Sequence, residues 1–171
     1  GEPVAIAGVM GGEGSMTMDD TTSLLLESAN FDGVSVRKTS TRLGLRTDAS
    51  IRYEKILDPE MTPDAIRRYV KLLEDIDAGA RVVSRLSDVK VRGFNEVTLA
   101  FDQSFVDRYT GIAISGDEIE HTLTALGFGV QRDGDRFTVE VPSWRRTKDV
   151  TIKADIIEEI TRIYGYDNFE I

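Results

Sequence analysis

Cysteine is absent from this chain of 171 residues, and it contains one histidine and one tryptophan. Without cysteine, disulfide frameworks, thiolate zinc sites and cysteine nucleophiles are excluded. His121 is expected on the surface of a helix, so the sequence gives no support for a Ser-His-Asp relay. No apolar run approaches the roughly 18–20 residues that cross a bilayer, and no charged-then-apolar leader opens the chain. We therefore expect a cytoplasmic protein that does not contact a membrane.

Acidic residues exceed basic ones by 30 to 21, which gives a formal net charge of −9. This balance opposes non-specific binding to nucleic acids and to anionic membranes. Residues 37–55 differ, because six basic residues stand there against two acidic ones. Two interpretations stay open: a solvated face with internal ion pairs, or a basic patch that binds RNA.

The first part of the chain combines short apolar runs, glycines and two helical patterns. Residues 4–10 indicate a strand that leads into a glycine-rich turn, and residues 23–29 indicate a short buried strand. Residues 32–43 and 61–78 have helical spacing, and the apolar stripe of the second helix predicts a face packed on the core. Residues 1–80 are thus expected to form a domain with a sheet and helices.

The second part of the chain has its own compact pattern. Residues 81–94 are polar and β-prone and are expected to link two domains. Over residues 95–171 the order is strand, helix, helix, hairpin and a last helix from about residue 149 to residue 164. A unit of this size can fold alone. The predicted fold class is α+β, with a small helix-rich second domain.

Three segments of the first part could carry chemistry. The glycines of residues 7–12 permit close approach of the backbone to a ligand, but the pattern matches no phosphate-binding motif and favours a tight strand–strand connection. Glu27 interrupts an apolar run, so it is either an exposed strand residue or an acceptor for a ligand's hydroxyl or ammonium group. Residues 42–54 resemble neither a packed helix nor a strand, and such irregular segments often line sites.

Four carboxylates gather at the last predicted helix. Asp155, Glu158 and Glu159 stand at i, i+3 and i+4, and Asp149 lies about a turn and a half upstream. Like charges at this spacing repel one another, and Mg²⁺ would relieve the repulsion. The spacing alone favours a solvated acidic face softened by neighbouring basic residues.

Five ordered segments carry a resemblance to a known family. They are Ala-Gly-Val-Met-Gly-Gly (7–12), Leu-Glu-Ser-Ala-Asn-Phe-Asp (26–32), Leu-Arg-Thr-Asp-Ala-Ser-Ile-Arg-Tyr-Glu (45–54), Val-Pro-Ser-Trp-Arg (141–145) and Asp-Ile-Ile-Glu-Glu-Ile-Thr-Arg-Ile-Tyr-Gly-Tyr-Asp-Asn (155–168). Together they resemble the beta subunits of bacterial phenylalanyl-tRNA synthetases over essentially the whole chain. The resemblance implies the C-terminal part of an editing domain, followed by a small domain similar to helix-rich nucleic-acid-binding folds.

The resemblance also implies an activity and its partners. The family attaches phenylalanine to its tRNA with ATP and Mg²⁺, in an α2β2 assembly whose α subunit holds the aminoacylation site. The β subunit hydrolyses tyrosyl-tRNA formed in error. ATP is expected to serve the whole enzyme without binding to this chain. The N-terminal half of the editing domain, with its pocket histidine, is missing here, so the chain alone is expected to be inactive. The alternative is a non-enzymatic RNA-binding module.

Residue by residue, the resemblance implies two sites. In the editing pocket, Glu27 is implied to be the acid that contacts the tyrosine hydroxyl. A site that hydrogen-bonds a hydroxyl can disfavour the substrate that lacks it by a factor of roughly 10⁴–10⁵. The remaining assignments are a backbone wall of Ala7, Gly8 and Gly11, a side-chain lining of Thr47 and Ala49, and a magnesium site, shared with the α subunit, of Asp149, Asp155, Glu158 and Glu159.

Overall fold

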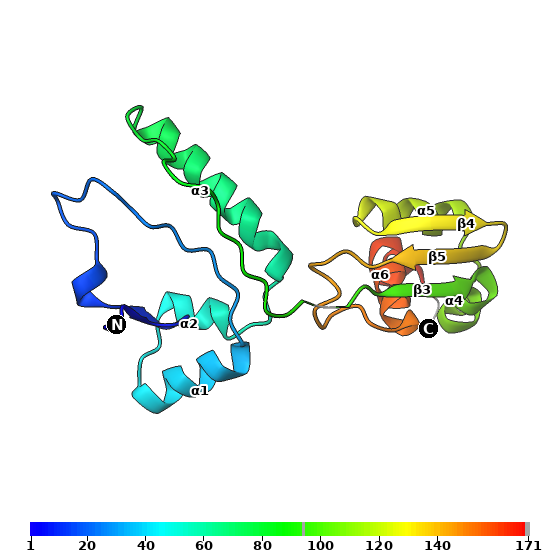
Figure 1. Cartoon of the computed structure of the whole chain (residues 1–171). Coiled ribbons are helices and arrows are strands. Elements are labelled where there is room, and N and C mark those ends of the chain that lie inside the picture. The colour runs from blue at the N-terminus through cyan, green and yellow to red at the C-terminus, as the bar shows by residue number, and fades with distance from the viewer. Residues whose placement is uncertain (94, 170–171) are drawn as a thin grey trace. The chain divides into compact units, whose positions relative to one another are not determined.

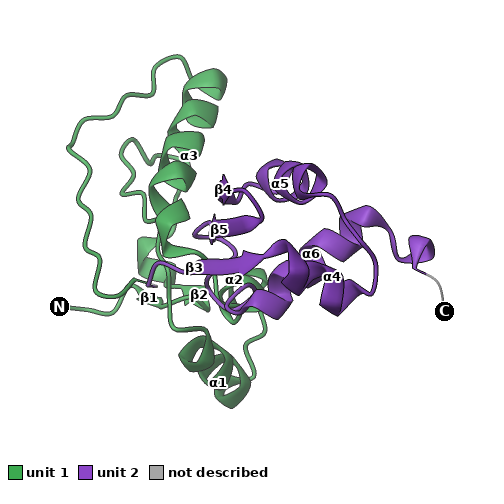
Figure 2. Ribbon diagram, turned by 90° about the vertical axis from the view of Figure 1, so that its right-hand side faces the viewer, with its two compact units in different colours: residues 1–93 green, residues 94–171 purple. Residues whose placement is uncertain are grey.

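The computed structural model describes residues 1–93 and 95–169 and divides into two compact units, residues 1–93 and 94–171 (Figure 2). Phe94, Glu170 and Ile171, which fall in the predicted linker and the predicted small domain, lie outside the described residues. Both units contain helices and antiparallel strands, so the predicted α+β class is confirmed. Among the described residues, no helix has the length and the apolar character that a membrane crossing requires.

Unit 1 begins with a small hairpin and continues with helices that are joined by long segments without regular structure (Figure 1). In the hairpin Ala5 pairs with Gly11 and Ile6 pairs with Met10. The elements are β1 (Ala5–Ile6), β2 (Met10–Gly11), η1 (Glu13–Ser15), α1 (Gly33–Leu43), α2 (Asp48–Tyr53), η2 (Pro59–Met61) and α3 (Thr62–Ile76).

Local signals at the helix ends explain α1 and α2. Asp32 caps α1 by accepting from the Ser35 amide, and Gly44 ends the helix with a φ of 66°. The predicted helix over residues 32–43 is thereby confirmed.

The prediction that residues 42–54 are irregular is wrong, because α2 lies within them. Thr47 and Ser50 form a capping box at its start, and this pair of hydroxyls was the signal in the sequence.

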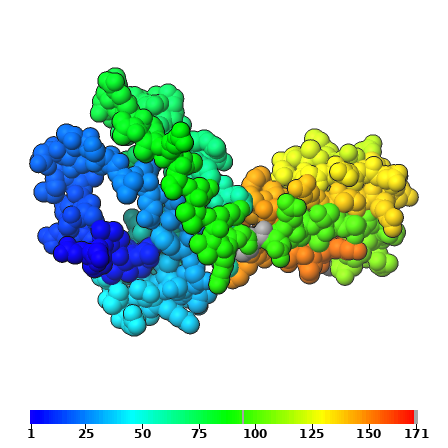
Figure 3. All heavy atoms as spheres, viewed as in Figure 1, coloured from blue at the N-terminus to red at the C-terminus, as the bar shows by residue number. Residues whose placement is uncertain are grey.

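Two expectations for unit 1 are corrected by the structure. Residues 23–29 form no strand, and the Leu25 side chain is 99% exposed. A β-strand needs a neighbouring strand with which its backbone can form hydrogen bonds, and no described segment pairs with residues 23–29. In the space-filling view the blue N-terminal residues arch around an opening in this unit (Figure 3). The hydrophobic core of unit 1 consists of Val9 and Val36 among the described residues.

The apolar face of α3 is the second correction. The predicted helix over residues 61–78 is observed as α3, but its stripe is not packed on a core. Tyr69 and Leu72 are more than two-fifths exposed, and Ile76 is 84% exposed. The spacing of apolar residues identifies a helix face that can be buried, but burial also needs a facing element, and the described part of unit 1 offers none.

Unit 2 is a three-stranded antiparallel sheet with the strand order β3-β5-β4. Helices α4, α5 and α6 cover one face of this sheet (Figure 2). Period-2 alternation places Leu99, Phe101, Phe137 and Val139 on the covered face, where Phe101 pairs with Phe137. The elements are β3 (Thr98–Asp102), α4 (Gln103–Thr110), α5 (Gly116–Ala125), β4 (Gly129–Asp133), β5 (Arg136–Glu140), α6 (Lys153–Tyr164) and η3 (Tyr166–Asn168).

The last helix begins later than predicted. It was expected from about residue 149, but α6 starts at Lys153. The Asp155 carboxylate accepts hydrogen bonds from the backbone amides of Thr151 (2.7 Å) and Ile152 (2.9 Å). These bonds satisfy amides at the helix start, so Asp155 fixes where the helix begins.

Candidate functional site

The glycine turn and the start of α2 meet at the Thr47 hydroxyl. Thr47 Oγ1 donates to the carbonyl oxygen of Val9 at 2.5 Å and accepts from the Ser50 amide at 3.1 Å. Val9 is 1% exposed, so this hydrogen bond satisfies a carbonyl that water does not reach. Two segments that are 38 residues apart in the sequence are thereby held together.

Gly8 seats the same turn against the helical part of unit 1. Its φ is +69°, and a Cβ at this position would lie 2.9 Å from side-chain carbons of both Phe31 and Val36. The Phe31 ring meets the Tyr53 ring edge to face, with centroids 5.0 Å apart. The absence of a side chain at residue 8 is therefore a condition for this packing.

Replacing Gly8 with alanine is expected to destabilise unit 1 by about 3 kcal/mol, because the left-handed conformation and the crowding both oppose a methyl group. Amide hydrogen exchange in α1 and α2 measures the loss. Gly44→Ala is the matched control, because Gly44 has a φ of +66° but no atom within 4 Å of an added Cβ. It should lose only about 1–2 kcal/mol. Equal losses in the two variants would contradict the packing argument.

The other predicted pocket residues lie differently. Ala49 is half-buried in the first turn of α2, whereas Ala7 and Gly11 are exposed. Glu27 is exposed in the segment between η1 and α1, and in the described part of the chain it makes no hydrogen bond or ion pair. The structure thus brings the glycine turn together with Thr47 through Val9, and among the described residues no hydrogen bond or ion pair joins Glu27 to either of them.

The basic residues 37–55 are partly used within the protein. Arg46 forms two hydrogen bonds with the Glu54 carboxylate, at 2.9 and 3.3 Å. The hydrogen bonding from Arg46 lowers the pKa of Glu54 below its ordinary value. Arg52 donates to the backbone carbonyl of Asp48. These internal partners agree with the ion-pair interpretation and do not favour RNA binding.

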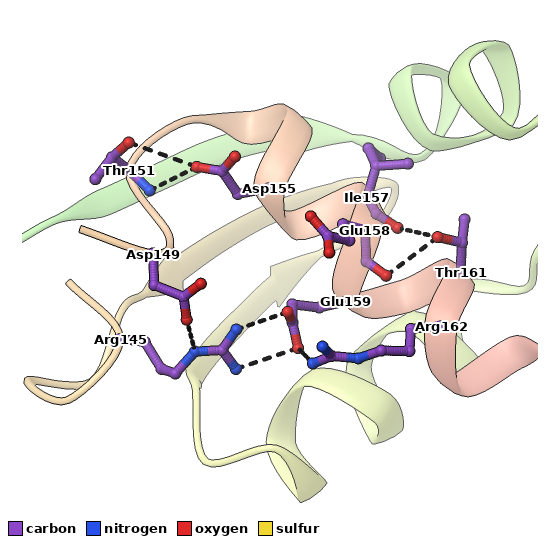
Figure 4. A network of polar contacts seen from close by, with 9 residues as sticks. All are labelled: Arg145, Asp149, Thr151, Asp155, Ile157, Glu158, Glu159, Thr161 and Arg162. Atoms are coloured by element: carbon purple, nitrogen blue, oxygen red, sulfur yellow. Dashed lines mark hydrogen bonds and ion pairs between the residues drawn. The ribbon is translucent and has the colours of Figure 1, made fainter. Parts of the chain in front are cut away.

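A second cluster joins the loop before α6 to the helix itself (Figure 4). The Arg145 guanidinium donates to both carboxylate oxygens of Glu159, at 2.6 and 3.2 Å, and to Asp149. Arg162 also pairs with Glu159, at 2.5 Å. Burial opposes the charged form of Arg145, but the hydrogen bond to Glu159 outweighs it and raises the pKa of Arg145. This cluster is a closed network of two cations and two anions.

The remaining two predicted magnesium ligands stand apart from this network. Asp155 is bound to the backbone at the start of α6, and Glu158 is exposed. In Figure 4 the Asp155 carboxylate is joined to Thr151, and no dashed line joins the Glu158 carboxylate to the Arg145–Glu159 pair. Among the described residues, no three histidine, cysteine, aspartate or glutamate side chains are grouped so that they could hold a metal ion. The magnesium assignment therefore stays a prediction.

Two known domain families match the chain, one in each of its two parts. Residues 1–78 match the B3/4 domain, and residues 99–166 match the tRNA synthetase B5 domain. The chain is 43% identical over 166 residues to the phenylalanine–tRNA ligase beta subunit of Solibacter usitatus, covering 96% of this chain and 22% of that protein. It is 42% identical over 166 residues to the subunit of the same name from Staphylococcus haemolyticus, covering 97% and 20%. The chain is therefore similar over nearly its whole length to a segment of phenylalanine–tRNA ligase beta subunits.

The chain spans about a fifth of the length of these family members. A crystal structure of an N-terminal fragment of the phenylalanyl-tRNA synthetase beta subunit from Pyrococcus horikoshii aligns with a TM-score of 0.39 at 19% identity, covering 46% of this chain and 22% of that one. The two beta subunits and the two matched domains confirm the resemblance stated from the sequence.

Sequence reasoning missed residues at both clusters. Val9 and Phe31 stand inside the quoted family segments, but nothing in their spacing shows that they contact Thr47 and Gly8. Arg145 was missed as the partner of the acidic residues, although it stands four residues before Asp149. The i, i+4 spacing of an arginine and an aspartate was the available signal.

Proposed function

We propose that this chain serves as part of a cytoplasmic phenylalanine–tRNA ligase, which uses ATP to attach phenylalanine to its tRNA. The names of its relatives and the succession of a B3/4 and a B5 domain support this proposal. The partners proposed for the chain are the α subunit, in an α2β2 assembly, and tRNA. ATP is assigned to the whole enzyme and to no residue of this chain.

Unit 1 is proposed to form part of a pocket that hydrolyses tyrosyl-tRNA. The observation that carries this proposal is the hydrogen bond from Thr47 to Val9, because it joins the glycine turn to the loop that bears Thr47 and Ala49. In the proposed pocket, Ala7, Gly8 and Gly11 form the backbone wall. Backbone groups on such a turn can approach a ligand closely.

Glu27 is proposed to recognise the tyrosine hydroxyl. An ionised carboxylate accepts hydrogen bonds and offers no donor, so it pairs with a phenol and leaves the bare ring of phenylalanine without a partner. A site built in this way rejects the substrate that lacks the hydroxyl by a large factor, because its polar group is then left unpaired. Glu27 acts in substrate selection, and no proton transfer is assigned to it.

The test uses the complete two-subunit enzyme and its hydrolysis of tyrosyl-tRNA and phenylalanyl-tRNA. Glu27→Ala is expected to reduce the preference for tyrosyl-tRNA by roughly 10³ or more, because the hydroxyl loses its acceptor. Glu13→Gln is the control, because Glu13 is an exposed acid of the same unit in η1, outside the proposed pocket. An unchanged preference in Glu27→Ala would refute this role.

The isolated chain gives a second measurement. It is expected to hydrolyse tyrosyl-tRNA far more slowly than the complete subunit, because the proposed pocket has only part of its wall in this segment. Comparable rates for the chain and for the whole subunit would show that these residues are sufficient. Magnesium receives no step in this proposal, because no three of the four carboxylates are grouped around one point in the described part of this chain.

A further inference from the structure

The four carboxylates around α6 differ in what they face. Glu159 is buried, with a side chain 3% exposed, and both of its oxygens accept from guanidinium groups. Asp149 faces the same Arg145, and Asp155 faces backbone amides. Asp149 and Glu158 are both exposed, and of the four only Glu158 makes no side-chain hydrogen bond or ion pair with the residues that the structure describes.

The Arg145 guanidinium lies between the carboxylates of Asp149 and Glu159 and neutralises part of the acidic face of α6 that these four carboxylates form. Its side chain is 17% exposed, and the group also lies over the Phe128 ring, 5.8 Å from the centroid. All three of its nitrogens donate to carboxylates. Planar, multidentate pairing of this kind is the geometry in which arginine binds carboxylates most strongly.

A divalent ion in the same place would meet two obstacles. Mg²⁺ needs near-octahedral oxygen ligands at about 2.0–2.1 Å, and it would have to take Glu159 and Asp149 away from Arg145. The displaced guanidinium would then remain nearby as an unpaired, half-buried like charge, which is strongly unfavourable. The donor set therefore fits arginine and does not fit magnesium.

We propose that Arg145, assisted by Arg162, is the resident cation of the acidic face of α6, and that this chain does not bind Mg²⁺ through Asp149, Asp155, Glu158 and Glu159. Arg145 is a positioning residue, because it ties the loop before α6 to the helix. The inference is independent of the proposed editing pocket, whose residues belong to unit 1.

The experiment is a magnesium titration of the complete two-subunit enzyme without ATP, read by calorimetry at constant ionic strength, because an ion shared with the α subunit would not bind the isolated chain. The expected result is the same number of bound Mg²⁺ ions per α–β pair in the parent enzyme and in Glu158→Gln, since the carboxylates of α6 hold none. Loss of one bound ion per pair in Glu158→Gln would overturn the proposal.

A matched pair of variants separates the two models independently of the ion. Glu159→Gln is expected to lower the thermal midpoint by about 10 °C or more, because both guanidiniums lose their charged partner. Glu158→Gln should leave the midpoint within about 2 °C of the parent chain, since exposed groups contribute little. Equal shifts would overturn the proposal, and if Glu159→Gln does not fold, the titration of the complete enzyme and of its Glu158→Gln variant still decides it.

Discussion

Replacing Phe137 with alanine is expected to remove about 4 kcal/mol from the free energy of unfolding of unit 2. Phe137 is 0% exposed and lies in the middle strand β5, where its ring stacks on Phe101 with centroids 5.3 Å apart. Arg132 covers the same ring, 5.6 Å from its centroid. Truncation therefore opens a cavity in contact with both the sheet and the helices that cover it.

Urea denaturation followed by tryptophan fluorescence measures this loss. Trp144 is the single tryptophan of the chain and belongs to unit 2, so its emission reports the unfolding of this unit alone. Tyr166→Ala is the control, because Tyr166 is 61% exposed in the same unit and should lose less than about 1 kcal/mol. Similar losses in the two variants would mean that Phe137 is not the centre of the core.

Unit 2 could be predicted from the sequence because its signals are local. Asp102 caps α4, Ser115 caps α5, and Gly111 ends α4 with a φ of +75°. Each of these capping interactions joins residues only three or four positions apart, so the sequence pattern predicts it directly. The hairpin of β4 and β5 follows the same logic, because its turn residues stand between two alternating runs.

Unit 1 was predicted less well because its structure depends on distant partners. The leucines of residues 23–29 and the stripe of α3 are apolar, but whether they are buried depends on elements that lie elsewhere in the sequence. Among the predicted site residues, Thr47 could be identified only through the family resemblance. The sequence pattern is equally compatible with a hydroxyl that faces solvent. The contact between Thr47 and Val9 joins residues that are 38 apart in the sequence, and local spacing does not predict it.

The acidic face of α6 shows the same limit in its electrostatics. Spacing along a helix gives the repulsion among Asp155, Glu158 and Glu159, but it does not say which cation relieves it. The same sequence pattern is compatible with three ways to reduce this repulsion: exposure to solvent, a bound metal ion, or a guanidinium group from the preceding loop. The structure distinguishes them, because Arg145 reaches Glu159 from 14 residues away.

Arg145→Met is therefore expected to cost about 3–5 kcal/mol of the free energy of unfolding of unit 2, again read by Trp144 fluorescence. The substitution keeps much of the side-chain volume but leaves the buried Glu159 with Arg162 alone and removes the partner of Asp149. Arg162→Met is the control and should cost less than about 1 kcal/mol, because Arg162 is 48% exposed.

The double variant Arg145→Met, Glu159→Met tests whether charge or packing causes the loss. Replacing both members of a buried ion pair with apolar side chains removes the desolvated charge, so the double variant should be more stable than Arg145→Met by about 2 kcal/mol. The coupling should also persist in high salt, because ions screen a buried pair less than an exposed one. If the double variant were less stable than either single variant, with no coupling between the two sites, the network would contribute through packing and Arg145 would not be the cation that α6 requires.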